Sequence, residues 1–174
     1  MTPLGQFVAF TVGGRSYGIE IRSLVEVVNM VALTPVPLIS EGAGRHRSTA
    51  GLLNVRGHVL PVFDLRILLA VPVEGPTTAS RILIVRGPGL EAGLIVDSVE
   101  GVIDPRAENL GAVDKKTSSK MQAVLTNVYV ERDRLVLIMD VDRLLDVVYP
   151  EVSESGQVAS GASWADRAGR AGPS

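Results

Sequence analysis

Two aspartates, Asp64 and Asp140, lie 76 positions apart, and each directly follows an apolar run. One carboxylate from each half of a chain would allow two like charges to share a proton, as in the aspartic proteases. Neither aspartate is followed by the Thr-Gly or Ser-Gly turn that such a site requires. Asp is also a preferred N-cap residue, because its side-chain oxygen accepts a hydrogen bond from the first helical turn. The sequence therefore favours two helix N-caps over a catalytic pair.

The other residue types that carry chemistry are few. His46 and His58 both fall in predicted loops, and neither has metal-ligand spacing to a second histidine or a carboxylate. The chain has no cysteine, which excludes disulfides, thiol catalysis and sulfur-ligated metals. Neither Gly42-Ala43-Gly44 nor Gly87-Pro88-Gly89 opens a strand-to-helix phosphate loop. We therefore predict a protein that is not an enzyme and that binds no metal or cofactor.

Charge and hydropathy narrow the range of partners. The net charge is -2, from 17 basic and 19 acidic residues, so no overall field attracts nucleic acid or anionic lipid. The densest basic run, Lys115 to Lys120, has no interleaved aromatic residues and is expected to be a solvated loop. The N-terminus lacks a signal-peptide pattern, and no apolar run approaches the roughly 18 residues of a membrane span. We expect a soluble cytoplasmic protein that neither binds nucleic acid nor inserts into a membrane.

The elements around these residues occur twice. Residues 14–23 are echoed by residues 89–98 at an offset of 75, and residues 61–69 by residues 137–145 at an offset of 76. A third echo pairs Asn54-Val55 with Asn127-Val128 at an offset of 73. Echoes in one order indicate a duplicated unit with loops of different length.

Each copy is rich in short strands joined by turns. Gly13-Gly14 predicts a tight hairpin turn between residues 6–12 and 16–21, and Gly57 predicts another between residues 52–55 and 59–64. Short helices are expected after each aspartate. The matching strands of the second copy are 82–85, 90–96, 125–130 and 135–140, followed by a helix over 141–147.

Four or five short strands in each copy suit a small closed barrel, which removes exposed strand edges. The turn formers of residues 72–78 mark the joint, so barrel one is expected at about 5–72 and barrel two at about 77–148. Residues 151–174, which include Trp164, are rich in Ser, Gly and Ala and are expected to form a disordered tail.

Over residues 5–148 the sequence resembles the CheW-like family of bacterial chemotaxis coupling proteins. The ordered set of matching motifs is highly specific. It comprises Tyr17-Gly18-Ile19-Glu20-Ile21, Val25-Glu26-Val27-Val28, Thr34-Pro35-Val36-Pro37, the segment from Gly51 to Gly57, the segment from Val59 to Arg66, and the segment from Gly93 to Val99.

The resemblance implies a mainly β fold of two five-stranded barrels of the Src-homology-3 type, packed around a shared apolar seam. It also implies a non-catalytic adaptor that links the cytoplasmic tip of methyl-accepting receptors to the histidine kinase CheA, through the regulatory domain of CheA. The implied location is cytoplasmic, at membrane-associated receptor arrays. A CheW-like scaffold of a pilus-motility or developmental pathway is the alternative. Residues 40–49 lengthen the family's usual connection and could alter the choice of partner.

The resemblance also implies the residues that contact partners. They are Leu24, Glu26, Val27, Val28, Asn54, Arg56, Gly57, Arg66, Val96 and Val99. For the valines and Leu24, core packing is the alternative role. Arg56 has two possible roles that the sequence leaves open, direct contact with a partner and an ion pair with Glu26 that fixes the hairpin.

Overall fold

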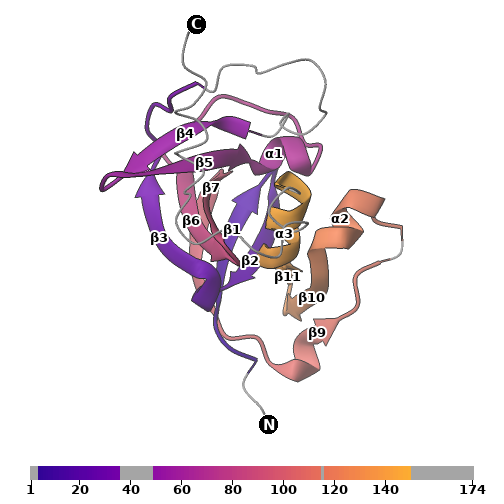
Figure 1. The fold of residues 1–174 in the computed structure, drawn as a ribbon. Coiled ribbons are helices and arrows are strands. Elements are labelled where there is room, and N and C mark those ends of the chain that lie inside the picture. The colour runs from indigo at the N-terminus through magenta and orange to yellow at the C-terminus, as the bar shows by residue number, and fades with distance from the viewer. Residues whose placement is uncertain (1–3, 36–48, 115, 150–174) are drawn as a thin grey trace, which may run out of the picture.

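The computed structural model describes residues 4–35, 49–114 and 116–149, which form two β-sheets and three short α-helices (Figure 1). The first sheet contains β1 Phe7–Val12, β2 Arg15–Glu20, β8 Ser98–Ile103, β9 Leu110–Gly111, β10 Leu125–Glu131 and β11 Arg134–Met139. The second contains β3 Leu24–Asn29, β4 Thr49–Val55, β5 His58–Asp64, β6 Arg81–Gly87 and β7 Leu90–Val96. The helices are α1 Leu65–Leu68, α2 Ser119–Val124 and α3 Val141–Val148, and two 3₁₀ turns lie at Ile21–Ser23 and Ala107–Asn109.

The predicted hairpins are confirmed, and their turns have the backbone that a right-twisted hairpin favours. Gly13 and Gly14 join β1 to β2 with φ of 59° and 76°, values that glycine adopts without steric cost. Arg56 and Gly57 join β4 to β5 with φ of 51° and 86°. Arg56 is thus a non-glycine residue held in the left-handed region.

Equivalent strands of the two copies occupy equivalent places in the two sheets. The strand orders are β8-β1-β2-β11-β10-β9 and β3-β6-β7-β5-β4. At the offset of about 75 residues, β1, β2 and β3 of copy one correspond to β6, β7 and β8 of copy two. Likewise β4 and β5 correspond to β10 and β11. Each sheet therefore contains the same series of elements, as a duplication requires.

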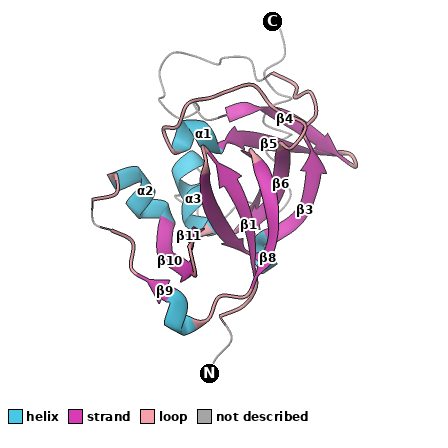
Figure 2. Cartoon of the chain, turned by 180° about the vertical axis from the view of Figure 1, so that it is seen from behind, coloured by secondary structure: helices cyan, strands magenta, loops and turns pink. Residues whose placement is uncertain are grey.

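The two copies exchange their first hairpins. The β1–β2 hairpin of copy one lies in the sheet of β10 and β11, and the β6–β7 hairpin of copy two lies in the sheet of β4 and β5. Parallel pairs, β2 with β11 and β5 with β7, connect the copies. Figure 2 shows β8, from copy two, next to β1. The loop at residues 72–78 joins the copies along the chain, but strands from both sides of it make up each sheet.

The strand register corrects the third sequence echo. Thr49 pairs with Phe63 as Leu125 pairs with Met139, so the hairpins align at an offset of 76. Asn127 then corresponds to Gly51, and the turn residue Arg132, with φ of 53°, corresponds to Arg56. The match of Asn54-Val55 with Asn127-Val128 is wrong, because a shift of three residues would break this pairing.

Both sheets close in the same way, because the segment that follows one edge strand pairs with the strand at the opposite edge. After β8 the chain continues to β9, which pairs with β10 at the far edge of its sheet. After β3 the chain continues to Thr34, whose backbone exchanges two hydrogen bonds of 2.9 and 2.8 Å with Leu52 of β4. These contacts turn each sheet toward a closed barrel, in agreement with the predicted fold class.

The buried side chains form one shared core and a smaller core for each sheet. The largest cluster joins Phe10 and Tyr17 of the first sheet with Phe63, Leu83 and Leu94 of the second. α3 adds the side chains of Val141, Leu144, Leu145 and Val148, which share one face of the helix. α2 lies beside α3 in both views (Figures 1 and 2). An apolar seam therefore holds the two sheets together.

Some elements differ from the expectations. β3, β8, β9 and α2 were not predicted as separate elements, and the end of the basic run 115–120 lies in α2. Most of the insertion 40–49, together with His46, and the predicted tail 151–174 with Trp164 lie outside the described residues.

Candidate partner-binding surface

The β4–β5 hairpin presents Arg56 at its tip. The Asn54 side-chain oxygen accepts a hydrogen bond of 2.9 Å from the Gly57 backbone N–H, which fixes the turn from within. The Arg56 side chain is 78% exposed. Asn54 and Gly57 therefore shape the turn, while the guanidinium of Arg56 projects into solvent.

Arg56 reaches across to β3. Its guanidinium donates a hydrogen bond of 3.2 Å to the Glu26 carboxylate, so the ion pair predicted as one of its two roles is present. An exposed pair of this kind contributes about 0–1 kcal/mol to stability. The contact matters more for position than for stability, because it links the hairpin tip to the neighbouring strand of the barrel.

β3 is one of the two edge strands of its sheet and alternates between partly buried and exposed residues. Val25 and Val27 are exposed, and Val31 beyond the strand is exposed as well. Leu24 and Val28 instead pack against the cores. Apolar side chains on an unpaired strand edge are a common feature of surfaces that bind partners. The predicted contact residues include Val27 but not Val25 or Val31. Residues 24, 25, 27 and 28 are all apolar, so the sequence does not show which of them point outward.

The two predicted residues of the second copy occupy other environments. Val96 is completely buried at the end of β7, and Val99 in β8 packs against the shared core. β8 belongs to the other sheet, where it pairs with β1. Glu26, Asn54, Arg56 and Gly57 lie together through these contacts, and the exposed Val27 follows Glu26 along β3. We call these five residues the hairpin surface, which includes neither Val96 nor Val99.

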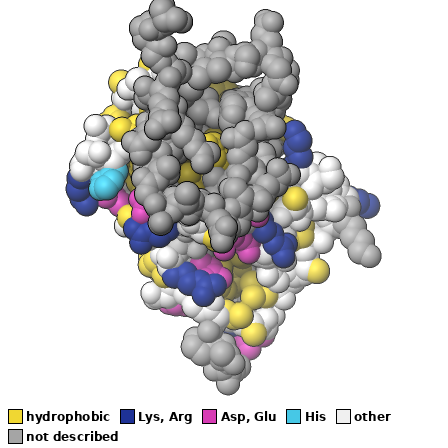
Figure 3. All heavy atoms as spheres, in the orientation of Figure 1, with side chains coloured by type: hydrophobic (Ala, Val, Ile, Leu, Met, Phe, Trp, Pro, Cys, Tyr) yellow, Lys and Arg dark blue, Asp and Glu magenta, His cyan; other side chains and the backbone are white. Residues whose placement is uncertain are grey.

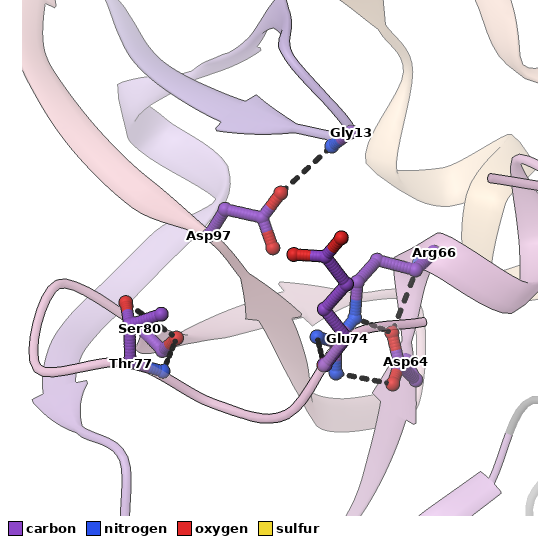
Figure 4. A network of polar contacts seen from close by, with 7 residues as sticks. All are labelled: Gly13, Asp64, Arg66, Glu74, Thr77, Ser80 and Asp97. Carbon is purple, nitrogen blue, oxygen red and sulfur yellow. Dashed lines mark hydrogen bonds and ion pairs between the residues drawn. The ribbon is translucent and has the colours of Figure 1, made fainter. Parts of the chain in front are cut away.

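Arg66 is likewise separated from the hairpin surface. It is 6% exposed, and its guanidinium donates two hydrogen bonds, of 2.9 and 2.7 Å, to the two carboxylate oxygens of Asp64. The same guanidinium bonds the Glu74 carbonyl oxygen, and the Asp64 hydrogen bond is the main reason that the pKa of Arg66 is raised. Figure 4 shows this cluster beside Asp97, which accepts a hydrogen bond from the Gly13 N–H. Arg66 thus stabilises the fold rather than presenting its side chain to a partner.

The two aspartates act as helix caps, as predicted. Asp64 accepts a hydrogen bond of 3.0 Å from the Arg66 N–H at the start of α1, and Asp140 accepts one of 3.0 Å from the Arg143 N–H at the start of α3.

Within residues 4–35, 49–114 and 116–149, no group of three His, Asp or Glu side chains could hold a metal. Over the same residues, no helix is long and apolar enough to cross a membrane.

The described side chains on the face seen in Figure 3 are of mixed type. Figure 3 shows charged side chains of both signs next to one another, with hydrophobic side chains between them.

Comparison with known proteins identifies related chains. The family model described as "CheW-like domain" matches residues 6–148. The chemotaxis protein CheW of Helicobacter pylori is 28% identical over 140 residues, which cover 80% of this chain and 81% of that protein. The crystal structure of the scaffolding protein TtCheW from Thermoanaerobacter tengcongensis superposes with a TM-score of 0.71 and 29% identity, covering 84% of this chain and 94% of that one. Protein PilI of Pseudomonas aeruginosa is 32% identical over 95 residues, 55% of this chain and 50% of PilI.

Proposed function

The chain belongs to the CheW-like domain family, and we propose that it is a non-catalytic adaptor that couples methyl-accepting chemotaxis receptors to the histidine kinase CheA. The observation that carries the proposal is the family match over residues 6–148, which includes both barrels. Relatives that share most of their length with this chain are named chemotaxis or scaffolding proteins. An adaptor needs two binding surfaces and no reaction centre, and the two barrels present different side chains at equivalent positions.

For the receptor, we propose contact at the hairpin surface. Val25 and Val27 offer exposed apolar side chains beside the Glu26–Arg56 ion pair. A receptor tip is a helical hairpin, and an amphipathic helix binds through an apolar stripe flanked by polar residues. The Arg56 guanidinium can then donate hydrogen bonds to the receptor while Glu26 holds it in position.

For the kinase, we propose that the ends of the barrels form the contact. The regulatory domain of CheA has the same double-barrel fold, and contact between unlike ends of like barrels can close into a ring. The proposed location is cytoplasmic, at receptor arrays.

A charge-reversal experiment tests the receptor contact. Arg56→Glu should reduce capture of a purified receptor tip about tenfold or more, because it places a carboxylate at the interface. The thermal transition should remain near that of the wild type, since the Arg56 side chain is 78% exposed. Arg134→Glu is the matched control, because Arg134 forms a similar ion pair of 2.7 Å with Glu100 in the other sheet. Equal losses in both variants would contradict a specific role for the hairpin surface.

The double variant Glu26→Arg with Arg56→Glu separates the two roles of Arg56. The reversed pair can still link the hairpin to β3. If receptor capture returns, Arg56 acts by positioning the hairpin; if capture stays weak, Arg56 contacts the receptor directly.

A second candidate is an adaptor of a pilus-motility pathway, favoured by the similarity to PilI over 95 residues. Affinity capture from the native cell distinguishes the two candidates by the receptor and kinase that are recovered.

A further inference from the structure

The two copies of the repeat exchange charge at two equivalent positions. Arg66 of copy one corresponds to Asp142 of copy two, and Asp97 corresponds to Arg22. The strand registers support this alignment, since Phe63 pairs with Leu94 as Met139 pairs with Ile19. We use "frame" for the end of the strand, the capping aspartate and the first turn of the helix that follows. This frame therefore carries a basic residue after its capping aspartate in copy one and an acidic residue in copy two.

In copy one the frame is filled. The Arg66 guanidinium lies on the Asp64 carboxylate and is almost completely buried. Ile82 and Ile95 of the neighbouring strands are buried in the small core of that sheet.

In copy two the same frame is open. A cleft of about 640 Å³ lies between the end of β2 and the start of α3. Its lining includes three acidic residues, Glu20, Asp140 and Asp142, and several apolar ones, among them Phe7, Leu110 and Ile138. Glu20 occupies the position that the buried Ile95 has in copy one, and Asp142 occupies that of Arg66.

The acidic groups of the cleft exceed the basic ones. Arg22 also lines the cleft, but it is paired with Glu20. Within the described part of the chain, no cation forms an ion pair with Asp140 or Asp142, and the Asp140 carboxylate accepts one hydrogen bond, from the Arg143 backbone N–H. Burial raises the pKa of Asp142, Asp140 and Asp146 raise it further, and Arg22 partly opposes them. The cleft therefore favours a cation.

We propose that this cleft binds an arginine side chain of a partner protein, with the guanidinium between Asp140 and Asp142 and the methylene groups against Phe7, Leu110 and Ile138. The duplicated frame of copy one is the precedent, because there the equivalent aspartate holds a guanidinium through two hydrogen bonds. Arginine suits the site better than lysine, since its planar fork matches carboxylates and its stem packs on apolar surface. Such a site does not depend on the adaptor role.

Titration of the isotope-labelled full chain with N-acetyl-arginine amide, followed by NMR, tests the proposal. We expect saturable shifts at the backbone amides of Thr126 and of residues 140–143, and no saturable shifts with the uncharged N-acetyl-citrulline amide. Asp142→Arg should abolish the arginine shifts and raise the thermal transition, because it supplies the counterpart of Arg66. Asp133→Arg, at an exposed position of the β10–β11 turn outside the cleft, should retain the shifts.

Saturable binding of citrulline amide, unchanged binding by Asp142→Arg, or no saturable shift in the wild type would each overturn the proposal. Should Asp142→Arg fail to fold, Asp142→Asn replaces it. That variant should weaken arginine amide binding about fivefold, as expected for the loss of one partly solvated ion pair. Unchanged affinity in Asp142→Asn would also refute the assignment.

Discussion

The substitution Arg66→Met is expected to destabilise the protein strongly. Both side chains of the Asp64–Arg66 ion pair are 7% exposed, and two hydrogen bonds of 2.9 and 2.7 Å join them. Methionine retains much of the arginine stem but leaves the Asp64 carboxylate buried without its cation. Removal of one partner of a buried pair costs about 3–5 kcal/mol. For a chain of this size, that loss lowers the thermal midpoint by roughly 10 °C.

Urea unfolding at neutral pH measures the effect, with two comparisons. Arg56→Met removes the exposed pair with Glu26 and should cost about 1 kcal/mol at most. Asp64→Asn combined with Arg66→Met removes both buried charges and should recover part of the loss, because no uncompensated charge remains. A loss below about 1 kcal/mol for Arg66→Met alone would refute the argument that burial makes this pair different from the exposed one.

Two further substitutions test the packing of the repeat and the charge of the cleft. Gly93→Ala would place a Cβ 2.8 Å from Ile82 Cγ2 and should cost about 1–3 kcal/mol in urea unfolding, whereas Gly111→Ala, with its nearest atom 3.9 Å away, should be almost neutral. Equal effects would contradict the packing argument. Burial raises the pKa of Asp142 above 3.8, so the folded state binds that proton more tightly and stability falls as pH rises through the interval between the two pKa values. Asp142→Asn should therefore melt higher than the wild type at neutral pH, with the difference disappearing at about pH 3 in a thermal scan; a lower midpoint at neutral pH would contradict this.

Much of the local structure could be predicted from the residues. Turn glycines located the β1–β2 hairpin, and the capping role of Asp64 and Asp140 followed from their place at the ends of strands. The Glu26–Arg56 contact was also expected as one of two alternatives. These features depend on short-range chemistry or on the family resemblance.

Other features depend on contacts between distant segments. Pairing of β2 with β11 is decided by the register of strands more than 100 residues apart, which no local pattern records. Arg66 was expected to contact a partner because of the family resemblance, and only the structure shows that its side chain is buried against Asp64. Val96 is the last residue of β7, which is buried on both faces. An apolar residue is expected there for packing alone, so it does not indicate an interface.

The exchange of hairpins between the copies has a consequence for the order in which the protein can form. The β1–β2 hairpin is synthesised first, yet its parallel partner β11 ends at Met139. During translation the edge of β2 therefore remains unpaired until nearly the whole domain has left the ribosome. Contacts of such large sequence separation slow folding, because the entropy of closing a long loop is lost before the contacts form. In this structure neither half supplies all the strands of a sheet, so we expect the two copies to fold as one cooperative unit.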